Sequence, residues 1–126
     1  MLLDDFKTYI INNNLQGSFE TWIDTRPDQP DSVICLFEYS GDSTQTGVEA
    51  LSRNIQLLVR AFDYDECRNK INQLFNEFDQ PVDRAISLTT SRWTLIAAKQ
   101  PPFKMEVDAL NRQVMVFNMI VVTHRD

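Results

Sequence analysis

The sequence of 126 residues contains only one histidine, two cysteines and three glycines. Histidine is the usual proton shuttle and metal ligand, and the single one, His124, lies at the end of the chain. No C-x-x-C or H-E-x-x-H motif is present, and Gly41 and Gly47 are too far apart to cradle a phosphate. The sequence therefore predicts no enzymatic activity, no metal site and no bound cofactor.

Clustered positive charge is also missing. The 12 basic residues are scattered among 18 acidic ones, and the net charge is −6. Proteins that read nucleic acids neutralise phosphates with clusters of Lys and Arg, so sequence-specific binding of DNA or RNA is disfavoured. An acidic protein can still lie close to DNA where its role requires that the DNA does not adhere.

Long apolar segments are absent as well. No run approaches the roughly 20 apolar residues that span a membrane, so no membrane contact is expected. The first residues include acids and lack the basic start of a signal peptide, which favours a protein that stays in the cytoplasm where it is made. Cys35 and Cys67 are then expected to be buried thiols, with a disulfide as the less favoured alternative.

The one tight acidic group consists of Asp63, Asp65 and Glu66. A hard cation could use these carboxylates. The favoured interpretation is structural, because acidic side chains in the first turn of a helix complement its macrodipole.

The stretch 53–78 is expected to form the centre of the fold. In its first half Ile55, Leu57 and Val59 alternate with polar residues, which predicts a strand with one covered face. The second half has apolar residues at three- and four-residue steps, which predicts an amphipathic helix. Asp63 is expected to cap this helix with its carboxylate. Because nothing separates the strand from the cap, the helix must fold directly back onto the sheet.

The length and a hydrophobic content of 43% predict one globular domain, residues 1–126. The order of elements predicts an α+β fold, with an antiparallel or mixed sheet of five to six strands and two helices packed on one side. A long polar loop is expected at 40–52. The helices are expected at 2–13 and 63–78, and the strands at 18–23, 33–39, 53–62, 85–90, 92–98 and 112–123, with 103–107 as an alternative further short strand.

The last strand is apolar on both faces, so it should be central or bury one face against another subunit. Met115 and Phe117 lie on one of these faces and are candidate interface residues. Trp22, Trp93 and Phe103 are near strand edges or loops, where large aromatic side chains can anchor a protein interface. The alternative for each aromatic residue is an ordinary place in the core.

Several segments occur in a characteristic order, spacing and total length. They are the N-terminal helix with Phe6 and Tyr9, the stretch 26–31 that leads into the strand 33–39 and Gly41, the strand and capped helix of 55–71, and the C-terminal pattern of Pro101 or Pro102, Asp108, Asn111-Arg112 and Phe117-Asn118. In these segments the chain resembles the minor capsid or tail terminator proteins of long-tailed bacteriophages, especially phages of Gram-positive bacteria. It departs from them at Ser40-Gly41, where many members have two glycines, and at Leu110-Asn111, where a glycine often precedes the arginine.

The resemblance implies a tail-terminator-like fold and a structural function. Such proteins form a homo-oligomeric ring, commonly hexameric, that caps the polymer of tail tube protein, fixes its length and meets the head connector protein. The protein would be made in the host cytoplasm and located in the virion, at the head–tail interface. DNA would pass through the lumen without specific binding, and a negative wall would repel its phosphates. The loop 40–52, with Asp42 and Glu49, is then expected to project towards a partner or the lumen.

Two other classes stay open. One is a capsid-associated or tail-tube-related structural protein of the same fold. The other is a small soluble enzyme or ligand-binding domain, which the missing catalytic constellation disfavours. Ring formation would separate the phage structural proteins from the small soluble domain, and binding to the ends of tail tubes would separate a terminator from the other structural proteins.

Overall fold

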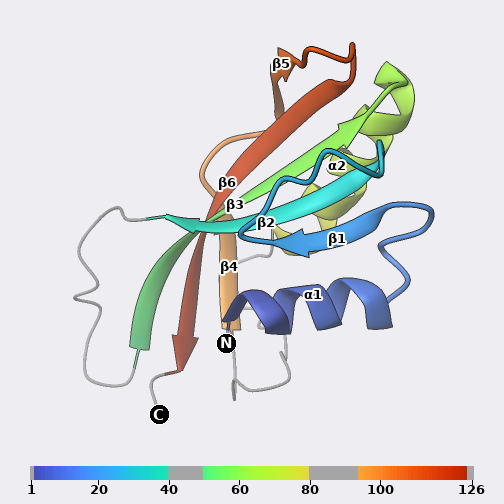
Figure 1. Ribbon diagram of the computed structural model, residues 1–126. Coiled ribbons are helices and arrows are strands. Elements are labelled where there is room, and N and C mark those ends of the chain that lie inside the picture. The colour runs from blue at the N-terminus through green and yellow to red at the C-terminus, as the bar shows by residue number, and fades with distance from the viewer. Residues whose placement is uncertain (1, 40–49, 80–93, 125–126) are drawn as a thin grey trace.

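The computed structural model describes residues 2–39, 50–79 and 94–124 (Figure 1). Two helices and six strands occur within these ranges, and all six strands belong to one sheet. The elements are α1 (Leu2–Asn12), β1 (Glu20–Ile23), β2 (Val33–Tyr39), β3 (Ala50–Ala61), α2 (Tyr64–Phe78), β4 (Thr94–Ala98), β5 (Phe103–Val107) and β6 (Gln113–His124).

The sheet is mixed. Its order is β1-β2-β3-β6-β4, and β5 also pairs with β6. Only β1 and β2 are parallel to each other, and the remaining pairs are antiparallel. β6 pairs with β3 along its whole length on one edge, while β5 and β4 share its other edge. The expected α+β fold is therefore confirmed, although the expected strand 85–90 lies outside the described residues.

Both helices cover the same face of the sheet, as expected from the sequence. In Figure 1, α2 lies behind β2 and beside β3, and its Phe75 ring packs on Phe117 of β6. The Asp63 carboxylate caps α2 by accepting a hydrogen bond from the backbone N–H of Glu66 at 2.9 Å. α1 meets α2 through an edge-to-face contact between Phe6 and Phe78, whose ring centroids are 5.2 Å apart. The apolar stripe of α2 is fully buried and comprises Cys67, Ile71, Leu74 and Phe78.

Among the described residues, two strand boundaries differ by more than one residue from those expected from the sequence. β1 begins at Glu20 because Ser18 and Phe19 belong to a turn, in which the N–H of Phe19 donates to the carbonyl of Gln16 at 3.1 Å. β3 begins at Ala50 because β6 continues far enough to pair with it, and Ala50 lies opposite His124. The last residues of the expected loop 40–52 are therefore in a strand.

The second face of the sheet also carries a buried cluster, formed by Val33, Cys35, Leu58, Val114 and Val116. Trp22 and Phe37 pack against this cluster. The connection between the parallel strands β1 and β2 also contacts this face. A chain that links parallel strands must return along their full length, and a helix usually makes this crossing. Here residues 24–32 return as an extended loop, which Figure 1 shows running back beside β2. This loop contacts the side chain of Arg60, which shares a strand face with Leu58.

Phe117 and Phe103 give a matched test of which side chains form the main core. Phe117 is fully buried and packs edge-to-face on Phe75 at 5.5 Å, whereas Phe103 is 44% exposed. Phe117→Ala should lower the free energy of unfolding by about 3–5 kcal/mol through cavity formation. Phe103→Ala should change it by about 0.5 kcal/mol or less. Urea unfolding at low protein concentration measures both, and equal losses would contradict the assigned core.

Candidate functional site

Two buried arginines hold the loop 24–32 against the sheet. Arg60 is 1% exposed, and its Nε and Nη2 donate to the carbonyls of Asp31 at 3.2 Å and Pro30 at 2.7 Å. Arg112 is 4% exposed, and its Nη1 donates to the carbonyl of Asp28 at 2.6 Å. A buried charged group that lacks hydrogen-bond partners is costly, and the loop carbonyls supply acceptors to these two buried guanidinium groups. We call Arg60 and Arg112 the arginine clamp.

The clamp also fixes the hairpin between β5 and β6. Arg112 Nε donates to Asp108 Oδ2 at 2.8 Å, while Asp108 Oδ1 accepts from the backbone N–H groups of Leu110 and Arg112 at 3.0 and 2.9 Å. A further ion pair joins Arg26 in the loop to Glu106 in β5 at 3.0 Å. The loop, β5 and the start of β6 are therefore joined through one network of charged groups.

Burial alone would raise the pKa of the Asp108 carboxyl, but hydrogen bonds from the backbone and side chain of Arg112 outweigh it, so this pKa lies below its ordinary value. Burial, and secondly the neighbouring Arg112 charge, lower the pKa of Arg60. Because Arg60 donates to carbonyl oxygens only, its charge has no carboxylate of its own.

Among the residues that the structure describes, a strongly exposed apolar segment lies at the free edge of the sheet. Every residue of β5 is exposed, with Phe103, Met105 and Val107 at 44%, 42% and 43%, and nearby Leu110 at 54%. A register shift at Met105 interrupts the pairing with β6. Exposed apolar groups on an edge strand mark a surface that other protein chains can cover. We call Phe103–Val107 together with Leu110 the β5 arm.

Two more exposed aromatic residues, Phe62 and Tyr64, extend this apolar region towards the start of α2. The ammonium group of Lys104 lies 6.0 Å from the centre of the Tyr64 ring. Lys104 makes no ion pair within the part of the chain that the structure describes. The exposed cation of the β5 arm is therefore available to another chain.

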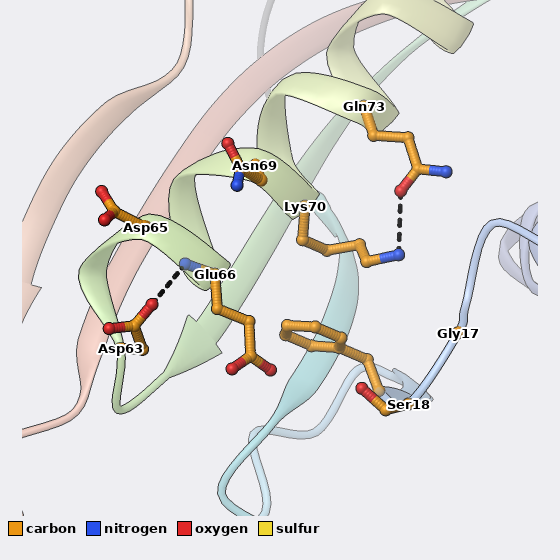
Figure 2. Close-up of a pocket in the computed structure, with 9 residues that line it drawn as sticks. Gly17, Ser18, Asp63, Asp65, Glu66, Asn69, Lys70 and Gln73 are labelled. Carbon is orange, nitrogen blue, oxygen red and sulfur yellow. Dashed lines mark hydrogen bonds between the residues drawn. The ribbon is translucent and has the colours of Figure 1, made fainter.

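An open groove of about 580 Å³ lies on the other side of α2, between its first turns and residues 17–19 (Figure 2). Figure 2 shows Glu66 and Lys70 on the side of α2 that faces Gly17 and Ser18. Lys70 Nζ donates to the carbonyl of Leu15 and to Gln73 Oε1, both at 2.8 Å. Asp63, Asp65 and Glu66 also line the groove, so three carboxylates outnumber one ammonium group and the groove is acidic.

The structure buries some of the residues predicted to form an interface and leaves others exposed. Met115 and Phe117 lie on the face of β6 that the helices cover and are buried in the main core, so of the two alternatives for this strand the structure shows the central position. The reason is that α2 packs directly on β6 and covers both side chains. These residues cannot meet a partner while the subunit is folded.

The remaining predicted residues have other positions. Trp22 is half-buried against the second-face cluster, and its indole N–H donates to Glu20 Oε1 at 3.1 Å. Phe103 is exposed in the β5 arm. Asp42, Glu49 and Trp93 lie outside the described residues.

Cys35 and Cys67 are both free and buried, and desolvation raises the pKa of each thiol to about 11. Both therefore remain protonated near neutral pH and are poor nucleophiles. Within residues 2–39, 50–79 and 94–124, no group of three or more His, Cys, Asp or Glu side chains could hold a metal ion. Nor is any helix in these ranges long and apolar enough to cross a membrane.

In the sequence analysis, neither the arginine clamp nor its partner Asp108 received a structural role. These residues appeared there only as parts of the segments that resemble the phage family. The available signal was two arginines at adjacent strand ends beside a loop rich in proline and aspartate, but their pairing with loop carbonyls depends on contacts between distant segments.

Comparison with solved structures shows a similar fold in a chain from the virion of a native gene transfer agent (GTA) particle. The TM-score is 0.64 at 9% identity, over 97% of this chain and 90% of that chain. No curated protein matches the sequence significantly. The sequence matches the bacteriophage tail terminator protein family over residues 9–124. The chain belongs to this family, and it is therefore a phage structural protein located in the virion.

The charge on Asp108 should make stability depend on pH. Because its folded pKa is lowered, the charge stabilises the fold above the unfolded pKa of about 3.9, and this contribution is lost as the pH falls through the folded pKa. Asp108→Asn should cost about 1.5–3 kcal/mol at pH 7. The two proteins should begin to converge in stability below about pH 4 and should match only once the pH lies below the folded pKa. Urea unfolding at pH 7 and at a series of lower pH values measures this.

The matched control for Asp108→Asn is Asp24→Asn, which neutralises an exposed aspartate at a positive φ of 57° that asparagine also tolerates. This change should leave stability at pH 7 nearly unaltered. A constant difference between wild type and Asp108→Asn at all pH values would contradict the role assigned to the charge.

Proposed function

We propose that copies of this chain assemble into a ring that caps the tail tube, ends its growth and joins the tail to the head connector. The observation that carries the proposal is the match to the tail terminator family over residues 9–124. The expected copy number is six, as the family resemblance implies. We also propose that residues 1–126 form one domain, because the described elements share one sheet.

The exposed β5 arm supports assembly. Three apolar side chains on a five-residue strand, with Leu110 beside them, are left in solvent by the isolated subunit. Covering this surface with another chain would remove apolar area from water and pair a free strand edge. A virion protein that functions only in an assembled state can retain such a surface.

The net charge of −6 fits a ring through which DNA passes. A negative lumen repels phosphate and would let DNA move without adhering to the wall. The two buried arginines do not oppose this, because loop carbonyls and carboxylates already occupy them.

The direct test is a phage in which the gene for this chain is inactivated. Tail tubes should then grow past their normal length and fail to join heads, because nothing ends the polymer. Electron microscopy of lysates measures tail length and head attachment, and wild-type protein supplied in trans should restore both. A loss of tails altogether would contradict capping and favour a component of the tube itself.

We further propose that Asp42 and Glu49 face a partner or the lumen. Asp42→Asn combined with Glu49→Gln should leave folding intact and reduce the yield of joined virions, as measured by titre in the same complementation assay. The matched control neutralises two exposed acids elsewhere, through Asp4→Asn and Asp24→Asn. Equal titres for all three proteins would exclude a role for the pair.

A further inference from the structure

The β5 arm and the groove are different surfaces on either side of the first turns of α2. The arm is attached to the free edge of β6, and its Lys104 lies 6.0 Å from the Tyr64 ring. The groove lies between Glu66 and Lys70 of α2 and residues 17–19, which lead directly into β1. Two different surfaces suit a head-to-tail contact, and repetition of such a contact generates a ring when the rotation closes.

We propose that the β5 arm of each copy binds in the groove beside α2 of the next copy. Each subunit would thus give its arm to one neighbour and receive an arm from the other. This inference rests on the proposed ring and names the two surfaces that hold it together. The occupant of the groove is a second copy of this chain.

Charge complementarity supports this occupant. In the arm, Glu106 is already paired with Arg26 and Asp108 with Arg112, so Lys104 supplies the available charge. In the groove, the three carboxylates of Asp63, Asp65 and Glu66 outnumber the one ammonium group of Lys70. A cation on the arm therefore meets an anion in the groove.

The apolar groups are complementary as well. A second hollow of about 200 Å³ adjoins the groove and shares Gly17 with it. Ile11, which is exposed, lines this hollow. Apolar side chains of the β5 arm would meet Ile11 there, while Lys104 reaches Glu66. The arm itself is held in place by the arginine clamp, so little order is lost when it docks.

A short strand and one loop residue make a small contact compared with the roughly 1,200–2,000 Å² of a stable interface. Single contacts should therefore be weak, while closure of a ring holds each copy at two places at once. This predicts monomers in dilute solution and rings at high concentration or on a tube end.

Charge reversal tests the contact. Lys104→Glu alone and Glu66→Lys alone should each reduce ring formation by roughly fivefold or more, because like charges would then meet at every contact. The double variant in one chain should restore it. The measurements are sedimentation at high protein concentration and occupancy of tail tube ends by electron microscopy. Both residues are exposed, and circular dichroism and thermal unfolding should show that each variant folds.

A mixture of the two single variants gives the sharper test. The reversed arm of one variant fits the reversed groove of the other, and the unaltered arm fits the unaltered groove. Alternation of the two proteins should therefore rebuild rings of even copy number from chains that fail separately. Rescue by mixing shows that the contact is between chains, which rescue within one chain does not.

The control variant is Lys99→Glu, used in place of Lys104→Glu. It reverses the charge of another exposed lysine that lies outside the arm. It should neither disrupt rings nor rescue Glu66→Lys. Single variants that assemble as wild type does, or a mixture that stays unassembled, would overturn the arm-and-groove contact. Failure of wild-type protein to form rings or occupy tube ends would instead overturn the proposed function.

Discussion

The fold depends on hydrogen bonds between two buried arginines and the carbonyls of the loop 24–32. β1 and β2 are parallel, yet no helix joins them, so an irregular segment must cross the sheet with its polar backbone against an apolar surface. Arg60 and Arg112 satisfy the carbonyls of Asp28, Pro30 and Asp31. Without these donors, the loop would lose its attachment and the second apolar face of the sheet would open to solvent.

The same arginines connect the core to the proposed assembly surface. Arg112 orders the hairpin through Asp108, and the loop reaches β5 through the ion pair between Arg26 and Glu106. A strand at the edge of a sheet with every residue exposed would otherwise be poorly held. The clamp thus presents apolar side chains in a fixed conformation. In the proposed assembly, this preorganisation would lower the entropy lost when copies associate.

Local patterns predicted much of the fold from the sequence. The alternation of Ile55, Leu57 and Val59 and the three- and four-residue spacing from Cys67 to Phe78 reflect periodicities that the backbone itself imposes, so the central strand and helix were correctly placed. The cap at Asp63 was predictable for the same reason. The parallel direction of β1 was not specified, because pairing direction is set by contacts between segments rather than within them.

The assembly surface was harder to predict. The β6 strand is apolar on both faces, and nothing in its own sequence shows that α2 covers Met115 and Phe117. Phe103 was chosen as an aromatic residue near an edge, but Met105, Val107 and Leu110 were not, because alternation in β5 resembles that of a half-buried strand. Their exposure follows from the position of β5 at the free edge of β6, which is a property of the whole sheet.

The central claim is that this chain forms a ring at the end of the tail tube. The most direct measurement is a cryo-electron microscopy reconstruction of tube ends after purified protein is added to purified tail tubes. The account predicts one closed layer of this chain at a single end of each tube, with β5 of each copy against a neighbour. Protein distributed along the tube wall, or tube ends that stay bare, would contradict it.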